Sequence, residues 1–304
     1  IDEIMAAEMA VLPGMEEMAN LLYILDYYEK GQFDAIIVDC APTGETLRLL
    51  SFPEILRWWM DRIFPIQRRA ASLLRPMVKG FTDIPFPSDQ VFKTAEMLFS
   101  QLEKMRAVFT DPEKTSVRLV VNPEKMVIKE AQRTYTYLNL YGYSTDLIVC
   151  NRVIPPEVSD PYFDVWKQRQ SQHFQSIEER FSPIPIRTIP LFSSEVVGID
   201  TLRSMAEALF GQDDPTQIFY RGQPQVLRKR ADGCYVLSLT LPFITKQDLS
   251  LNRKGDELII EVGAYRRNIM LPLTIVDLPI REAKFEDNKL HIHFEPAKKA
   301  ELPR

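Results

Sequence analysis

Hydrophobic positions follow two different periods along the chain. Up to about residue 211, stretches with helical spacing alternate with short β-rich runs such as 117–121 and 146–150, which are typical of strands in a parallel sheet. After residue 225 the runs are short and alternate apolar with polar residues. The pattern therefore predicts an α/β domain with a parallel sheet over 1–211, a linker over 212–225, a small all-β sandwich over 226–296 and a tail over 297–304.

The same periods predict the individual elements. Helices are expected over 2–30, with a break at Pro13–Gly14, and over 88–110, 126–141, 160–181 and 201–210. In the sandwich, strands are expected over 235–241, 248–251, 257–262, 266–271 and 289–294, with turns at 254–256 and 286–288. A strand, a helix and a second strand between residues 117 and 150 imply a right-handed crossover between parallel strands.

A further apolar run, Ala35–Val38, ends on the carboxylate of Asp39. Such a run predicts a buried strand with Asp39 at its carboxyl end, where open α/β sheets bind ligands. Pro42 and Gly44 would then break the strand. A carboxylate at that edge suits a nucleotide-bound magnesium ion, usually through a coordinated water. Spacing alone equally fits an ordinary buried strand that stops at an aspartate.

Composition narrows the function classes. The net charge of −5 gives no sign of a nucleic-acid surface, so no nucleic-acid partner is expected. Cys40, Cys150 and Cys234 are far apart and form no C-x-x-C pair, which indicates a reducing compartment and argues against a cysteine zinc site. No uninterrupted apolar run approaches the ~20 residues of a membrane span.

The glycines bear on nucleotide chemistry. None of the eleven glycines is followed by lysine, although a P-loop needs a Gly-Lys step, because glycine amides surround the phosphates while the lysine reaches the β- and γ-phosphate oxygens. The chain also opens at Ile1, within a helical pattern and without a methionine. From this we expect that the N-terminal P-loop portion is missing and that the chain is a piece of a longer protein.

The stretch that follows Val38 resembles a known ATPase signature. Asp39-Cys-Ala-Pro-Thr43-Gly44-Glu-Thr-Leu-Arg is similar to the switch II sequence Asp-Thr-Ala-Pro-Thr-Gly-His-Thr-Leu-Arg of the deviant-Walker ATPases. These include the arsenite-pump ATPase ArsA and the Get-type ATPases that target tail-anchored membrane proteins. Cys40 and Glu45 are departures, and neither removes Asp39. The resemblance implies a P-loop NTPase-type fold that uses ATP and Mg, with Asp39 on the magnesium side and Thr43 and Gly44 relaying the γ-phosphate state.

Two later segments resemble the base-binding loops of that family. Asn-Arg-Val-Ile-Pro from residue 151 matches a segment whose asparagine contacts adenine, and an asparagine amide can pair donor to acceptor on one edge of a base. The segment from Ile189 resembles the loop Pro-Leu-x-x-x-Glu-Val-Arg-Gly, with Val197 in place of the arginine, which puts a charge contact there in doubt. The resemblance implies a cofactor-binding set of Asn151, Arg152, Pro190, Leu191 and Phe192.

The family also implies a use for residues 56–81. In the Get-type relatives, the helices after switch II form the surface that accepts hydrophobic client helices, and nucleotide state opens or closes it. Here a bulky apolar segment is followed by a basic amphipathic one, and core helices with solvated arginines are the alternative interpretation. The candidate client-binding residues are Leu56, Trp59, Met60, Ile63, Phe64, Leu73, Leu74 and Met77.

The part after residue 225 is similar to the α-crystallin domain of small heat-shock proteins. The link from Val262 to Arg266 is too short for the extra dimerisation strand that some of those proteins carry, so their large oligomers are not expected. The zinc-binding C-x-x-C of the eukaryotic targeting ATPases is absent from the sequence, so a zinc-clamped dimer is not expected, while a homodimer stays open. His291 and His293 share one strand face, where a solvent-facing pair is the simpler alternative to a metal site.

Three functions remain open. The first is an ATP-hydrolysing switch whose nucleotide state controls the binding of hydrophobic client segments, such as tail-anchored or other apolar helices, in the cytoplasm, or in the chloroplast stroma of a plant. The second is an ATP-independent peptide-binding or chaperone module. The third is an arsenite or anion pump ATPase subunit, whose chemistry uses thiolates. The three cysteines do not cluster in sequence, although the fold could bring two of them together.

Overall fold

The computed structural model describes residues 15–40 and 89–295, and it divides into two compact units, Ile1–Phe109 and Thr110–Arg304. The described part of the first unit contains the helices α2 (Met15–Lys30) and α5 (Asp89–Phe109). Both helices were predicted from hydrophobic spacing and are confirmed over these residues, while residues 2–14 lie outside the description. Among the described helices of the chain, none has the length and apolar content of a membrane span.

The two helices of the first unit bury apolar side chains and pack together. Leu25 of α2 and both Leu102 and Met105 of α5 are almost fully buried. At the surface, Lys104 forms an ion pair with Glu29 at 3.2 Å. An amphipathic helix gains most of its stability by burying such an apolar stripe, so the pairing follows from the spacing.

Residues 35–39 do not form the expected strand. They have no regular secondary structure and are exposed, and Ile37 exposes 91% of its surface. An apolar run becomes a strand only when its backbone N–H and C=O groups pair with a neighbouring strand, and none of the strands in the described ranges pairs with this run. The strand prediction is therefore wrong, and Asp39 lies exposed in an irregular segment.

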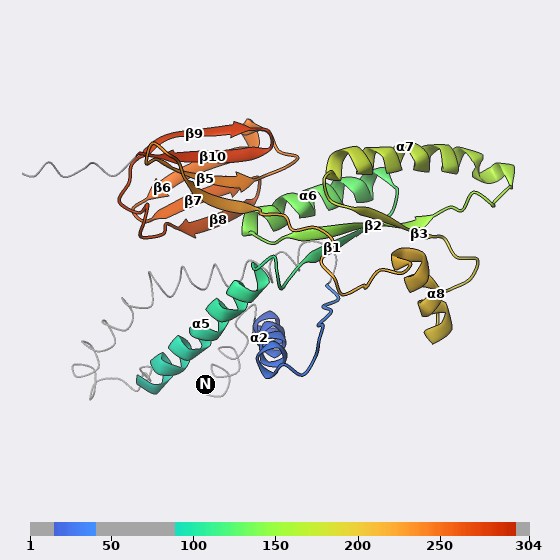
Figure 1. Ribbon diagram of the computed structural model, residues 1–304, viewed down its shortest axis with the longest axis horizontal. Coiled ribbons are helices and arrows are strands. Elements are labelled where there is room, and N and C mark those ends of the chain that lie inside the picture. Colours follow the sequence, from blue (N-terminus) through green and yellow to red (C-terminus); the bar gives the residue numbers. More distant parts are fainter. Residues whose placement is uncertain (1–14, 41–88, 296–304) are drawn as a thin grey trace, which may run out of the picture. The chain divides into compact units, whose positions relative to one another are not determined.

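The second unit begins with a parallel sheet in the order β1-β2-β3, made by β1 (Val117–Val121), β2 (Thr145–Val153) and β3 (Ile186–Pro190). The crossovers are the helix α6 (Lys125–Tyr141) and the helix α7 (Asp164–Phe181), which follows the short turn η1 (Pro161–Phe163). Helix α8 (Ile199–Phe210) comes after β3. Figure 1 shows α6 and α7 over one face of the sheet and α8 over the other.

These parallel strands and helices confirm the α/β prediction. Leu147, Ile148 and Val149 of β2 are all buried, as expected for a central strand covered on both faces. Helix α6 ends at Gly142, whose φ of 87° is the left-handed conformation that glycine adopts at no steric cost. One difference matters for the site, because β2 continues past Cys150 to Val153 and includes residues that were expected in a loop.

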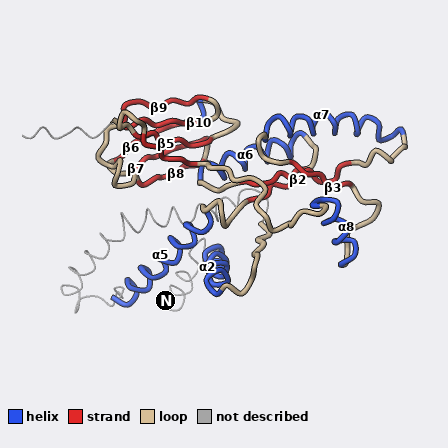
Figure 2. The backbone as a smooth tube through the Cα atoms, viewed as in Figure 1, coloured by secondary structure: helices blue, strands red, loops and turns tan. Residues whose placement is uncertain are grey.

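The rest of the second unit contains two antiparallel sheets, β4-β5-β10-β9 and β6-β7-β8. Figure 2 shows this part as strands and loops, and its one helical turn is η2 (Lys246–Asp248). Inward-facing residues such as Leu239, Ile260 and Ile292 are fully buried, which confirms the predicted small β domain. The strands are β4 (Gln225–Lys229), β5 (Tyr235–Thr240), β6 (Leu249–Lys254), β7 (Glu257–Val262), β8 (Tyr265–Met270), β9 (Ile280–Glu286) and β10 (Lys289–Phe294).

Two strands of this domain, β4 and β9, were missed by the sequence prediction. Both lie at the edges of the four-stranded sheet, and both are rich in charged residues, as in Arg-Glu-Ala-Lys within β9. Edge strands often carry charges, which oppose pairing with another chain, so their apolar alternation is weak. The short link between β7 and β8 is confirmed, because only Gly263 and Ala264 join them.

Candidate functional site

The carboxyl end of β2 is irregular where Asn151 and Arg152 lie. The pairing of β2 with β3 shifts register between Cys150 and Val153, and Arg152 has a φ of 57°, a left-handed conformation that costs free energy in a non-glycine residue. The Arg152 backbone N–H donates to Asn151 Oδ1 at 2.9 Å. This bulge holds the Asn151 amide by its oxygen, so the amide can still donate through Nδ2. Bulges and strained residues of this kind often aim side chains at functional sites.

The end of β3 lies beside this bulge. Val153 is in register with Pro190, and the Leu191 backbone N–H donates to Val153 O at 2.8 Å. Pro190 is half-buried and Leu191 exposes 44% of its surface. Phe192 packs against the buried cluster of Leu147, Val149 and Ile189 beneath α8. The two neighbouring strand ends therefore place the Asn151 amide and the backbone of Arg152 next to a small apolar surface.

Helix α7 holds the loop that leaves β2. The Ile154 backbone N–H donates to Gln170 Oε1 at 2.9 Å, and Lys167 Nζ donates to Pro156 O at 3.1 Å and to Val158 O. Sequence reasoning missed Gln170 and Lys167, because α7 is polar along most of its length and nothing in the spacing separates these two residues from the rest. Their contacts tie the bulge to a helix, so the loop after Asn151 has a defined course.

The other predicted site residues belong to the other unit or lie outside the described residues. Asp39 belongs to the first unit, whereas Asn151, Arg152, Pro190, Leu191 and Phe192 belong to the second. Thr43, Gly44 and all candidate client-binding residues between Leu56 and Met77 lie outside the described residues. Their roles stay predictions.

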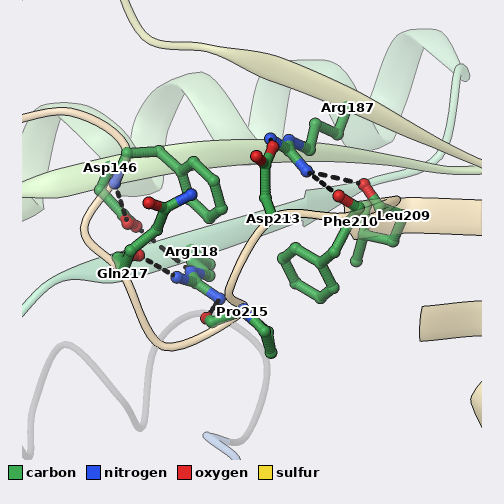
Figure 3. Close-up of polar contacts among 9 residues, drawn as sticks. Arg118, Asp146, Arg187, Leu209, Phe210, Asp213, Pro215 and Gln217 are labelled. Atoms are coloured by element: carbon green, nitrogen blue, oxygen red, sulfur yellow. Dashed lines mark hydrogen bonds and ion pairs between the residues drawn. The ribbon is translucent and has the colours of Figure 1, made fainter. Parts of the chain in front are cut away.

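Residues 212–222, here called the strap, connect α8 to the sandwich and lie on the sheet (Figure 3). The Arg118 guanidinium donates to Pro215 O at 2.8 Å and to Gln217 O at 2.9 Å. The Phe219 backbone N–H donates to Oδ2 of the fully buried Asp146 at 3.1 Å, and Arg118 Nε lies 3.5 Å from Oδ1 of the same carboxylate. The stretch marked as a linker in the sequence is thus bound to β1 and β2.

A second arginine holds the other end of the strap. Arg187 of β3 donates to Leu209 O and Phe210 O, each at 3.1 Å, and to the Asp213 carboxylate. Its guanidinium also lies 4.4 Å from the centroid of the Phe219 ring, a cation–π geometry. Sequence reasoning missed both arginines, although Arg118 interrupts the otherwise apolar strand β1 and that interruption was a usable signal.

The described cysteines do not form a thiolate site. Cys150 and Cys234 are buried and Cys40 is exposed in the first unit. Burial raises the pKa of the Cys150 thiol to about 11, so this group is protonated and a poor metal ligand near neutral pH. In residues 15–40 and 89–295, no three His, Cys, Asp or Glu side chains are grouped so that they could hold a metal ion.

The two histidines of β10 lie on the four-stranded sheet. His291 Nδ1 is 2.9 Å from Ser238 Oγ on β5, so this ring takes part in a cross-strand hydrogen bond. Burial and then the positive charge of Arg230 lower the pKa of His293 below its ordinary value of 6.5, while Glu282 opposes the shift and His291 and Lys284 add to it. His293 is therefore a part of the sheet whose charge couples its stability to pH.

Acidification is expected to weaken the sandwich through His293. Because the folded pKa is below the unfolded one, the unfolded chain binds this proton more readily, so stability falls as the pH drops from about 6.5 toward the folded pKa. Urea unfolding at about pH 7.5 and about pH 5.5 measures the difference. His293→Gln should reduce this difference. An unchanged pH dependence in His293→Gln would contradict the prediction.

Comparison with known proteins matches the chain to two family models. The model of the family described as "Anion-transporting ATPase" matches residues 1–211, and the model of an "HSP20-like domain found in ArsA" matches residues 232–294. The expectation that a P-loop portion is lacking is not borne out by these matches.

Several relatives align along most of the chain. The "Putative arsenical pump-driving ATPase 1" of Aquifex aeolicus is 37% identical over 296 residues, 96% of this chain and 74% of the relative. A protein of the same name without the numeral, from Chlorobaculum tepidum, is 36% identical over 307 residues, 100% of this chain and 76% of the relative. The "ATPase get3" of Pyrenophora tritici-repentis is 26% identical over 210 residues, 68% of this chain and 62% of the relative.

The family match and the fold agree on the organisation of the chain. One family model covers more than half of the residues, and the other falls on the antiparallel sheets. These matches show that the chain belongs to the anion-transporting ATPase family and carries the HSP20-like domain found in ArsA.

Proposed function

We propose that the protein binds ATP with magnesium and that nucleotide state controls its binding of hydrophobic client segments. The observation that carries this proposal is the arrangement at the ends of β2 and β3, where the Asn151 amide is held by the Arg152 N–H beside Pro190 and Leu191. A purine needs a hydrogen-bonding edge and an apolar surface for its face. These residues fit both needs.

Each residue has a distinct part in this proposal. Asn151 donates through Nδ2 to a ring nitrogen of the base, and Pro190 and Leu191 cover a face of the base. Arg152 supplies a positive charge and further N–H donors at the same strand end. Asp39 orients the water shell of the metal, and Thr43 and Gly44 pass on the state of the γ-phosphate. When bound, magnesium ATP supplies the phosphoryl group and neutralises its charge.

The client in this proposal is an apolar helix such as a tail anchor, met by residues 56–81 in a homodimer without a zinc clamp. The support for it is the resemblance of switch II together with relatives named ATPase get3 and ATPase ASNA1 homolog. We place the protein in the cytoplasm, or in the stroma if the source is a plant. Export of arsenite is less well supported, because Cys150 and Cys234 are buried and the Cys150 pKa is raised.

Replacing Asn151 by alanine is expected to weaken ADP binding by about tenfold, because it removes one or two hydrogen bonds to the base. Calorimetry on the product of the complete reading frame measures the affinities for ADP and GDP, and the preference for ADP should shrink in Asn151→Ala. The matched control is Asn252→Ala, at an exposed position of β6. Equal ADP affinity in Asn151→Ala and wild type would remove Asn151 from the site. If the wild type binds no ADP, the nucleotide proposal fails and the ATP-independent peptide-binding module is the remaining function.

A further inference from the structure

The peptide group between Val153 and Ile154 is held from two sides. Its carbonyl oxygen, Val153 O, accepts a hydrogen bond from the Leu191 backbone N–H at 2.8 Å. Its N–H, which belongs to Ile154, donates to Gln170 Oε1 at 2.9 Å. Because one planar group carries both bonds, Gln170 on α7 fixes the orientation of the plane that also bonds the segment after β3.

This peptide group directly follows the strained bulge of β2. Arg152 has a φ of 57°, and a left-handed backbone in a non-glycine residue persists only when its surroundings hold it. Pairing with β3 holds the chain before the bulge at Cys150 and after it at Val153, where β2 ends. The next hold on the chain comes from Gln170 and not from the sheet.

Gln170 occupies a packed position of α7. The half-buried Phe174 and the buried Ile177 and Phe181 follow it at helical spacing, so an apolar side chain at 170 would extend this apolar stripe. The chain has an amide there instead, and Lys167, three residues earlier, donates to two carbonyls of the same loop. Polar groups at packed positions are there to satisfy buried partners, and here the partner is the backbone beside the bulge.

The bulge also determines which end of the Asn151 amide is free. The Arg152 backbone N–H is a donor, so the amide atom that it meets is Oδ1, and Nδ2 is left as a donor for a ligand. At its pairing edge adenine offers the ring nitrogen N1 as an acceptor, whereas guanine carries a hydrogen on the same nitrogen. A donor held in this orientation favours adenine, and rotation of the bulge would lose the discrimination.

We propose that Gln170 is a positioning residue that sets the preference for adenine over guanine by acting through Asn151. The inference rests on the proposed nucleotide function. The Gln170 oxygen holds the peptide group that joins the Asn151 bulge to the Leu191 surface, so the donor for the base edge keeps a fixed position relative to the surface for the base face. Without this acceptor the bulge relaxes and the Asn151 amide turns away from the edge of the base.

Calorimetry with magnesium ADP and magnesium GDP on the product of the complete reading frame tests this role. Gln170→Met keeps the length of the side chain but removes the acceptor, so ADP binding should weaken about five- to tenfold. GDP binding should change little, which shrinks the preference for ADP. Gln170→Glu keeps an acceptor oxygen and should retain the preference. The matched control is Gln175→Met on the exposed side of α7, where Gln175 bonds Glu179 within the helix.

A double variant separates positioning from a general effect on the fold. The apolar surface contacts either purine alike, so the preference for ADP reports on Asn151. In Asn151→Ala, the addition of Gln170→Met should therefore leave the remaining preference unchanged. A further loss of preference in the double variant would show that Gln170 does not act through Asn151. If Gln170→Met does not fold, Gln170→Asn decides, because it keeps the amide and withdraws the acceptor by one methylene group. Retained preference in Gln170→Asn would then reject the role.

The failure of this inference is distinguishable from the failure of the proposed function. A wild type that binds neither ADP nor GDP contradicts the nucleotide function, and the positioning role fails with it. A wild type that binds ADP and GDP equally overturns the specificity alone. Wild-type preference for ADP in Gln170→Met overturns the role of Gln170 and leaves the nucleotide function standing.

Discussion

Replacing Asp39 by alanine is expected to lower the magnesium-dependent ATP turnover of the complete protein by about a hundredfold or more. The reason is that phosphoryl transfer depends on a correctly placed metal, and the carboxylate at the start of the switch II segment orients the metal's water shell. Asp39 lies in the family-matched region, and in the described structure it is exposed. Among the described residues, none forms a hydrogen bond or ion pair with the Asp39 side chain, so the loss should appear in turnover and not in stability.

The control for this variant lies in the same segment. Asp34 is also exposed and precedes the apolar run, so Asp34→Ala removes an equal charge without touching the signature and should turn over ATP at the wild-type rate. Chelation of magnesium should bring wild type to the level of Asp39→Ala and should change the variant little. Wild-type turnover in Asp39→Ala would mean that Asp39 does not act on the metal. A wild type without turnover would instead contradict the ATPase proposal.

The Arg187→Ala substitution is expected to lower the free energy of unfolding of the second unit by about 2–4 kcal/mol. The guanidinium satisfies Leu209 O and Phe210 O at the end of α8, pairs with Asp213 and stacks on Phe219. Its removal leaves the carbonyls at the helix end without this donor and loosens both α8 and the strap. Urea unfolding followed by circular dichroism measures the change.

An exposed arginine of α8 provides the comparison. The Arg203 side chain is 67% exposed and pairs with the almost fully exposed Asp200 at 3.6 Å, and such surface pairs contribute at most about 1 kcal/mol. Arg203→Ala should therefore change the free energy of unfolding little. Arg187→Lys should fall between wild type and Arg187→Ala, because lysine keeps the charge but lacks the planar fork of donors. Equal losses in Arg187→Ala and Arg203→Ala would show that the strap does not depend on Arg187.

The elements that could be predicted are those whose burial gives a recognisable pattern of apolar residues in the sequence. The core strand β2 is apolar at consecutive positions because helices cover both of its faces, and α6 shows apolar residues at helical spacing. The edge strands β4 and β9 were missed because charged residues, which oppose pairing with another chain, weaken the apolar–polar alternation of an edge strand. The run at 35–39 was wrongly predicted as a strand for the opposite reason. It is an apolar run, but it pairs with none of the described strands.

Some residues of the candidate site could likewise be predicted from the sequence, and others could not. Asn151, Pro190 and Leu191 were identified from short motifs, and the structure brings these residues together at neighbouring strand ends. The bulge and the left-handed backbone of Arg152 were not predictable, because β2 was expected to end at Cys150. Gln170 and Lys167 were missed because a polar residue on a polar helix carries no local signal of its partner.

The sequence by itself determined the order of the elements, the change from an α/β pattern to a β sandwich and the family, because these depend on residues close together in the chain. Only the tertiary structure decided which residues hold the parts together. Arg118 reaches carbonyls 97 and 99 residues away, and Arg267 bonds a carbonyl 127 residues away. A hydrogen bond requires an acceptor at a defined distance and angle, and at such separations in the chain that geometry arises only from the packing of the whole unit.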